Sequence, residues 1–240
     1  MTQHFRGYLR IVRHTPDIIP AGTLFPACCC CVKEPYAMPQ YHLIYFDARG
    51  RGELTRWLLE YSGTPYTEER IAFADWAVRK QSVPTGKVPI LMVDGRPLAQ
   101  SLAIARYLAK EVGLVPKDNL EAAFADALAD TIAEMMSAFY KNKMSSLSED
   151  EKERKFNEEI KPTIIRPLLG DLNEHLAGRS WYSCEQISWV DLLIAVEFGG
   201  LRKSYPKLLD DFPKVAGHVD KVMALPKIEA WVKRRPDTFL

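Results

Sequence analysis

Two polar side chains, Gln100 and Ser101, stand at the start of the run LAQSLAIARYL, which spans residues 98–108 just after a proline-containing turn. The apolar residues of this run have the spacing of a helix. A serine often caps a helix by accepting a hydrogen bond from a free backbone N–H group. A helix N-terminus that lines a cleft can instead bind an anion, because its N–H groups are free donors and the macrodipole is positive there. The spacing alone leaves both a helix cap and an anion site open.

Tyr45 is a second candidate, and it lies at the end of the β-rich run YHLIYF, just before the turn DARGRG. An aromatic side chain in a strand usually belongs to the core. At the end of a strand, however, it can face a cleft and offer a phenolic O–H group to a ligand. Arg51 in the same turn would add a positive charge beside it.

The elements that must position these residues follow an orderly pattern over residues 41–113. A strand over 41–46 is followed by ELTRWLLEYSG, whose apolar residues have helical spacing and which ends at Gly63. PYTEERIAF reads as a weaker strand, and ADWAVRKQSV as a short helix or an irregular segment. VPILMVDGRPLAQ predicts a hairpin because Asp94-Gly95 suits a two-residue turn, and SLAIARYLAKEVG predicts the closing helix. The order is βαβαββα, a mixed sheet with helices on its faces.

After the polar link LVPKDN (residues 114–119) the pattern becomes helical and stays so. EAAFADALADTIAEMMSAFY carries a wide apolar stripe, whereas SEDEKERKFNEEIK alternates in charge as a solvated helix face does. ISWVDLLIAVEF places Ser188 at an N-cap and Asp191 three residues later, which predicts a capping box. The last amphipathic run, LPKIEAWVKRRP, ends in a basic cluster that we expect to be a solvated helix end.

Composition and charge limit the kind of ligand. The chain has 240 residues, 47% of them hydrophobic, which suits one or two globular domains. Its 32 basic and 31 acidic side chains give a formal net charge of +1, without the electrostatic footprint of a nucleic-acid or membrane-surface binder. The sequence contains no apolar run of about eighteen residues that could span a membrane. We therefore expect a small molecule or a protein as partner, no nucleic acid and no membrane span.

Four of the five cysteines are consecutive, from Cys28 to Cys31, and Cys184 stands alone. This arrangement suits neither a disulfide framework nor the C-x2-C spacing of a zinc site. A single cysteine after residue 38 fits a reducing compartment.

Residues 1–37 are rich in proline and arginine and show no sustained period, so we expect an extension outside the core, disordered or a leader. Three origins stay open: an inert or alternative-start leader, an organelle transit peptide, and a palmitoylated cysteine tract. The Met38-Pro39 pair just before a clear strand favours the first.

The motifs YHLIYFDARGRGELTR, ADW, GKVPILMVDG, QSLAIARYL and LPKIEAWVKRRP, in this order, resemble the sigma class of cytosolic glutathione transferases over nearly all of residues 38–240. The resemblance implies an α/β plus all-α fold, with a thioredoxin-like βαβαββα domain over residues 38–115. An all-helical domain over residues 119–240 would form the electrophile site. A homodimer and a cytoplasmic location are also implied, with mitochondrial targeting by residues 1–37 as the less favoured alternative.

The same resemblance implies a glutathione site. The helix start at Gln100-Ser101 would hold the γ-glutamyl carboxylate, and Val88 would pair through its backbone with the cysteinyl residue like an added strand. A cis peptide bond would precede Pro89. The full set of implied glutathione-binding residues is Tyr45, Arg51, Trp76, Lys80, Gly86, Lys87, Val88, Pro89, Gln100 and Ser101.

Tyr45 is implied to be the catalytic residue. Its O–H group would donate to the sulfur of glutathione and favour the thiolate, helped by the positive field of Arg51. Lowering the thiol pKa from about 8.5 to about 6.5 is worth about 2.7 kcal/mol and raises the thiolate fraction at pH 7 from about 3% to about 75%. Trp76, Lys80 and Lys87 would flank the peptide and its glycine carboxylate, although lysines alone are more often solvated surface.

The predicted activity is conjugation of glutathione, as co-substrate, to hydrophobic electrophiles in detoxification, with peroxidase activity on lipid hydroperoxides as a further expectation. The alternatives are a glutathione-dependent prostaglandin D synthase and a non-catalytic carrier or structural relative. Prostaglandin D synthases of this family carry an acidic metal cluster and a tryptophan beside the substrate cleft. This chain keeps Asp130 but has Ala133 and Glu134 at the other cluster positions and Lys141 in place of the tryptophan. No metal is therefore expected.

Overall fold

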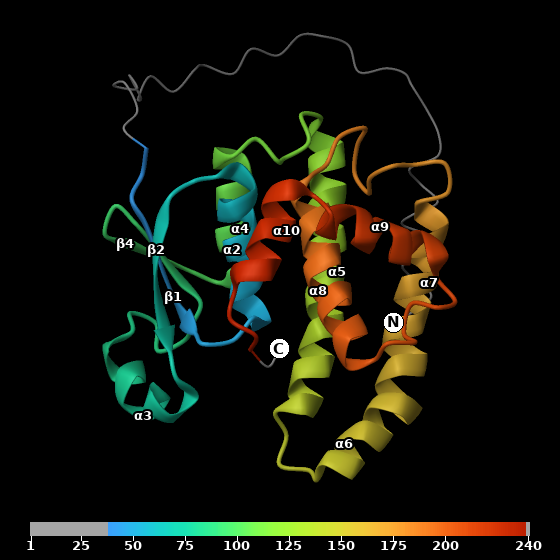
Figure 1. Ribbon diagram of the computed structural model, residues 1–240, viewed down its shortest axis with the longest axis horizontal. Coiled ribbons are helices and arrows are strands. Elements are labelled where there is room, and N and C mark those ends of the chain that lie inside the picture. The colour runs from blue at the N-terminus through green and yellow to red at the C-terminus, as the bar shows by residue number, and fades with distance from the viewer. Residues whose placement is uncertain (1–37, 239–240) are drawn as a thin grey trace, which may run out of the picture. The chain divides into compact units, whose positions relative to one another are not determined.

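The computed structural model describes residues 38–238, so the extension predicted over residues 1–37 lies outside the described residues. The first part of the described chain builds a four-stranded sheet (Figure 1). Its spatial order is β2-β1-β3-β4, from strands β1 (Tyr41–Phe46), β2 (Tyr66–Ile71), β3 (Ile90–Val93) and β4 (Arg96–Ala99). β1 and β2 are parallel and the other two pairs are antiparallel. The predicted mixed sheet is confirmed.

Helices and turns connect the strands in the predicted places. Asp94 and Gly95, which join β3 to β4, have φ angles of +49° and +78°, as a two-residue hairpin turn requires. The segment after β2 forms only short turns. The connecting elements are η1 (Gly50–Gly52), α2 (Glu53–Ser62), η2 (Phe73–Asp75), α3 (Trp76–Arg79), η3 (Lys80–Ser82) and α4 (Ser101–Glu111).

The rest of the described chain, from residue 119 on, is mainly helical, as predicted. Helix α8 packs against α5, α9 and α2, so it contacts both parts of the fold. The elements are α5 (Asn119–Lys143), α6 (Glu149–Lys155), the π-helical segment η4 (Phe156–Ile165), α7 (Arg166–His175), α8 (Trp189–Ser204), α9 (Pro213–Met223) and α10 (Pro226–Arg234). No helix between residues 38 and 238 is both long and apolar enough to cross a bilayer.

The charged run over residues 148–161 is only partly the solvated face that its alternating charges predict. Its charged side chains are mostly exposed, but Phe156 and Ile160 are buried. Phe156 stacks on Tyr205, with ring centroids 3.9 Å apart. The two apolar positions therefore anchor this segment to the helical core.

The basic C-terminal cluster is only partly the solvated helix end that the sequence predicts, because Lys233 and Arg234 are exposed whereas Arg235 is mostly buried. Trp231 donates from Nε1 to a carboxylate oxygen of Glu53 at 2.9 Å, and Arg235 forms an ion pair with the same carboxylate. Arg234 pairs with Glu60. A buried carboxylate on α2 needs donors, and the end of the chain supplies them.

The capping box predicted at the start of α8 is present. Asp191 is fully buried and accepts hydrogen bonds from the backbone N–H and the hydroxyl of Ser188, both at 2.8 Å. It also accepts from the backbone N–H of Tyr182 at 3.0 Å. The Asp191 side chain thus caps the start of α8 and also holds the loop before this helix.

Replacing Asp191 with Ala should lower the free energy of unfolding by about 2–3 kcal/mol, because three buried donors lose their acceptor. Urea denaturation monitored by circular dichroism measures the loss. Asp118→Ala is the matched control, since Asp118 caps α5 at an exposed position and should lose only about 1 kcal/mol. Equal losses in the two variants would contradict the special role assigned to Asp191.

Candidate functional site

The turn after β1 is built around the phenol of Tyr45. The Tyr45 side chain is buried, and its hydroxyl oxygen accepts a hydrogen bond from the backbone N–H of Arg51 at 2.8 Å. A Cβ atom on Gly50 would lie 2.7 Å from that oxygen, and one on Gly52 would lie 2.4 Å from the ring. The two glycines therefore let the turn wrap closely around the phenol. Because its oxygen accepts from Arg51, the hydroxyl keeps its own hydrogen for another acceptor.

The electrostatic surroundings keep Tyr45 protonated. Burial raises the pKa of its phenol, while the backbone hydrogen bond from Arg51 and the charges of Arg56 and Arg51 oppose that rise only in part. The net pKa lies above the usual value of about 10. At neutral pH the group is thus a neutral hydrogen-bond donor.

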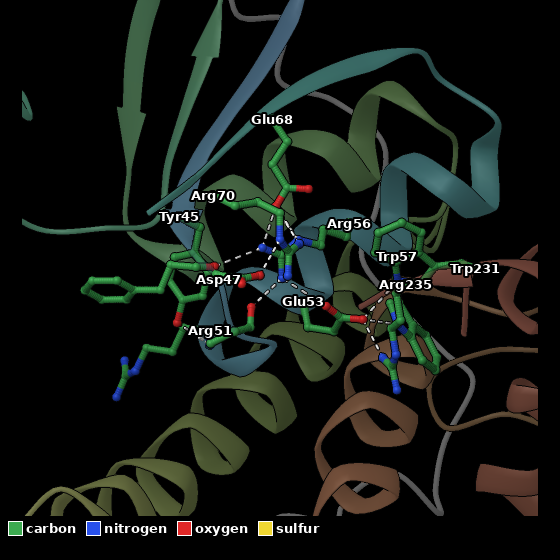
Figure 2. Close-up of polar contacts among 12 residues, drawn as sticks. Tyr45, Asp47, Arg51, Glu53, Arg56, Trp57, Glu68, Arg70, Trp231 and Arg235 are labelled. Carbon is green, nitrogen blue, oxygen red and sulfur yellow. Dashed lines mark hydrogen bonds and ion pairs between the residues drawn. The ribbon is translucent and has the colours of Figure 1, made fainter. Parts of the chain in front are cut away.

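Arg56 lies at the centre of a network of polar contacts beside the turn (Figure 2). Its side chain is fully buried and donates to the backbone oxygen of Ala48 at 2.7 Å. It pairs with Glu53 at 3.0 Å and with Glu68 at 2.5 Å, and its guanidinium lies 5.6 Å from the centre of the Tyr45 ring. Sequence reasoning missed this network. The one local signal was the spacing of three residues between Glu53 and Arg56 in the first turn of a helix.

A cavity of about 490 Å³ opens beside this turn. It gathers every predicted glutathione-binding residue except Tyr45. Tyr45 itself is not in the lining, but its chain neighbour Phe46 and its hydrogen-bond partner Arg51 are. Sequence reasoning missed three lining residues, Phe46, Thr85 and Ala99. The lining residues are Phe46, Arg51, Trp76, Lys80, Thr85, Gly86, Lys87, Val88, Pro89, Ala99, Gln100 and Ser101.

All charged residues of the described chain that line this cavity are positive, so we call it the cation-lined cavity. Arg51, Lys80 and Lys87 line it, and none of the described residues in its lining is acidic. A cavity with walls of one sign concentrates ligands of the opposite charge. Its geometry therefore favours a ligand that carries carboxylates.

The N-terminus of α4 also opens into the cation-lined cavity. Gln100 is the N-cap residue, with a φ of +75°, and within the described residues no side chain caps the helix there. Gln100 and Ser101 therefore do not form the side-chain cap that the sequence left open. An anion at this N-terminus would meet free N–H donors and the positive end of the helix dipole.

Val88 offers its backbone at the edge of the same cavity. The pairing of β1 with β3 ends at Ile44 and Ile90, so Val88 lies beyond the last paired residues. The peptide bond between Val88 and Pro89 is cis, as the family resemblance implied. An extended peptide can pair with a backbone in such a position.

A second cavity, of about 600 Å³, lies among α5, α8 and the C-terminal end, and we call it the α5–α8 cavity. Met136, Phe139 and Tyr140 of α5 give it one apolar and aromatic wall, whereas charged side chains such as Arg49 and Arg202 line other parts of it. A smaller space of about 30 Å³ shares Met136 and Tyr140 with it and shares Arg51 and Ser101 with the cation-lined cavity. This small space therefore borders both cavities.

Asp130, the acidic position that the chain keeps on α5, is paired with a basic side chain. The carboxylate of Asp130 accepts a hydrogen bond from Arg106 at 2.6 Å. Among residues 38–238 no three or more His, Cys, Asp or Glu side chains come together as metal ligands would.

Two family models match this chain. Residues 41–110 match the N-terminal domain of glutathione S-transferases, and residues 129–235 match the C-terminal domain. The chain belongs to the glutathione S-transferase family. Its activity is that of a glutathione S-transferase, and glutathione is its co-substrate.

Individual relatives agree with this family assignment. The transferase is 41% identical over 203 residues to the hematopoietic prostaglandin D synthase of Gallus gallus, across 85% of this chain and all of that relative. It is 33% identical over 203 residues to the probable glutathione S-transferase 6 of Caenorhabditis elegans, across 83% of this chain and 98% of that relative. A solved structure described as rat hPGDS complexed with a quinoline superposes with a TM-score of 0.78 at 38% identity, across 84% of this chain and all of that one.

Proposed function

We propose that glutathione binds in the cation-lined cavity. The γ-glutamyl carboxylate would lie at the N-terminus of α4, and the glycine carboxylate near Lys80 and Lys87. The observation that carries this proposal is a cavity with three cations, no acidic lining residue within the described chain and a helix N-terminus without a side-chain cap. The proposed binding residues are Tyr45, Arg51, Trp76, Lys80, Gly86, Lys87, Val88, Pro89, Gln100 and Ser101.

In this arrangement Tyr45 is the catalytic residue. Its hydroxyl keeps a free hydrogen while the N–H of Arg51 holds its oxygen, so it can donate to the glutathione sulfur and favour the thiolate. The backbone of Val88 would pair with the cysteinyl residue and bring the sulfur toward the turn. With a chloronitrobenzene, the thiolate sulfur would bond to the aryl carbon and chloride would leave.

Hydrophobic electrophiles, including lipid hydroperoxides, are the proposed second substrates. The apolar and aromatic walls that α5 gives to the α5–α8 cavity support this class. The proposed role is detoxification, and the proposed location is the cytoplasm. We assign the enzyme to the sigma class, with domains over residues 38–115 and 119–240. Mitochondrial targeting by residues 1–37 is the lesser alternative.

Prostaglandin D synthase activity is the second candidate, because relatives with that name are about 40% identical over their whole length. Lys141, Ala133 and Glu134 depart from the pattern of those enzymes, and Asp130 is held by Arg106. A non-catalytic role is the third, since the S-crystallin SL11 of Nototodarus sloanii is 31% identical over 207 residues. A panel of an aryl halide, a lipid hydroperoxide and a prostaglandin endoperoxide, each with glutathione, separates the three.

We also propose a homodimer in which the first domain of one chain faces the helical domain of the other. Light scattering of the purified full chain measures the mass directly. Twice the chain mass of 27.3 kDa would support the dimer, and a single chain mass would contradict it. One relative of 30% identity is described as the monomeric Na-GST-3 of Necator americanus, so the measurement decides between two real possibilities.

Replacing Lys80 and Lys87 together with Met should raise the Kd for glutathione about tenfold, because the glycine carboxylate loses its charged partners. Isothermal titration calorimetry measures the change. The double variant with Lys117→Met and Lys155→Met removes the same net charge at exposed positions outside the cavity and should bind like the wild type. Equal affinity in all three proteins would contradict the proposed orientation of the peptide.

A further inference from the structure

Glu197 is a carboxyl group at the junction of the two cavities. It belongs to α8 and lines both the α5–α8 cavity and the small space that includes Arg51 and Ser101. Tyr140 of α5 lines the same two spaces. Glu197 therefore stands between the proposed position of the sulfur and the room available to the electrophile.

Glu197 is also the acidic residue of the α5–α8 cavity that lacks a partner. The other two acidic side chains in its lining are paired, Glu53 with Arg235 and Asp237 with Lys203. Glu197 forms no hydrogen bond or ion pair with any residue in the described part of the chain. Glu197 is half-buried, and a carboxyl group with reduced access to water is costly unless something compensates it. A ligand in the cavity would supply the missing partner.

The surroundings of Glu197 keep it protonated at neutral pH. Burial raises its pKa to about 8, although Arg51 pulls the pKa down, and Glu53 adds to the rise. Glu197 is close enough to Tyr45 and Tyr140 for its charge to raise the pKa of each phenol. The remaining charged groups that line the same cavity are Arg49, Arg202, Lys203, Lys233, Arg235 and Asp237.

We propose that Glu197 is a further catalytic residue, which donates a proton to electrophiles whose attack by a thiolate creates an oxyanion. Two classes fit, α,β-unsaturated carbonyl compounds and organic hydroperoxides. The inference rests on the proposed function, since it needs the glutathione sulfur near Arg51. A neutral acid with a pKa near the working pH is suited to proton transfer.

The proton balance is simple for both classes. With an unsaturated aldehyde, the sulfur bonds to the β-carbon, the C=C electrons move toward the carbonyl, and the oxygen takes the proton of Glu197. The resulting enol then rearranges in water to the thioether aldehyde.

With a hydroperoxide, the sulfur attacks the outer oxygen, the O–O bond breaks, and the departing alkoxide takes the proton. The sulfur is oxidised to a sulfenic acid and the peroxide is reduced to an alcohol. In both cases the Glu197 carboxylate regains a proton from water.

An aryl chloride gives the matched comparison because it releases chloride and needs no proton. We expect Glu197→Gln to lower the ratio of kcat/KM for a 2-alkenal to kcat/KM for chloronitrobenzene at least tenfold. Glu158→Gln makes the same chemical change at an exposed position of η4 and should leave the ratio unchanged. The aryl chloride rate of each variant also shows whether its site has folded.

The pH dependence gives a second readout. In the wild type the ratio should fall as the pH rises through about 8, since Glu197 then loses its proton. In Glu197→Gln this fall should be absent. An unchanged ratio in Glu197→Gln overturns the inference, as does a loss that appears in Tyr140→Phe instead. If the wild type forms no conjugate at all, the proposed function fails and the inference fails with it, whereas conjugation with an unchanged ratio overturns the inference alone.

Discussion

Tyr45→Phe should lower kcat/KM for conjugation of glutathione to chloronitrobenzene roughly tenfold or more, because one preorganised donor to the sulfur is lost. The phenyl ring still fills the space between Gly50 and Gly52, so the turn should keep its conformation. The deficit should shrink as the pH approaches about 8.5, where the free thiol ionises unaided. Steady-state kinetics over a range of pH measure both effects.

Tyr66→Phe is the matched control for this prediction. Tyr66 lies on β2 outside the lining of both cavities, and its hydroxyl donates to Glu60 at 3.2 Å. Loss of the Tyr66 hydroxyl should leave kcat/KM within about twofold of the wild-type value, since substitutions away from a functional site have small effects. A Tyr45→Phe enzyme as fast as the Tyr66→Phe enzyme would remove Tyr45 from the mechanism.

Glu53→Ala should lower the free energy of unfolding by about 3–5 kcal/mol, because it leaves buried charges without their partner. The Glu53 carboxylate accepts from Trp57 and Trp231 and pairs with Arg56 and Arg235 (Figure 2). The first helix after the catalytic turn is thereby tied to the C-terminal end of the chain. Chemical denaturation at pH 7 measures the loss.

An exposed ion pair provides the control. Glu229 pairs with Lys233 on α10 and both side chains are more than half exposed to solvent. Glu229→Ala should therefore cost less than about 1 kcal/mol. A similar small loss in Glu53→Ala would contradict the structural role of the buried carboxylate.

The stabilisation that Glu53 provides should be lost at low pH. Burial alone would raise its pKa, but Arg56 and Arg235 outweigh burial, so the net pKa in the folded protein is lowered. A lowered folded pKa stabilises the protein at pH values above the unfolded pKa of about 4.3. The stabilisation disappears as the pH falls through the folded value. The difference between wild type and Glu53→Ala should therefore shrink in acid.

Much of the fold could be predicted because its signals are local. The Asp94-Gly95 hairpin, the helix end at Gly63 and the Ser188–Asp191 capping box all depend on residues within four positions of one another. Their backbone angles and hydrogen bonds follow from residue type alone. Each appears in the structure where the sequence placed it.

The features that the sequence did not predict depend on contacts between distant segments. Arg235 was expected in solvent, yet it pairs with Glu53, 182 residues earlier in the chain. Glu197 stands in an apolar helix run, and only the packing of α5 and α8 shows that it borders a cavity. Within the site, the order of the motifs indicated the residues that line the cation-lined cavity, whereas the structure was needed to show that Tyr45 is not among them.

The pKa of the glutathione thiol in the complex is the most direct measure of the central claim. Ultraviolet absorbance of the thiolate, recorded over a pH series with the wild-type protein and saturating glutathione, gives that pKa without any electrophile. We predict a value near 6.5, about two units below the value of about 8.5 for a free thiol. A bound thiol that still titrates near 8.5 would contradict the account, because Tyr45 would then not stabilise the thiolate.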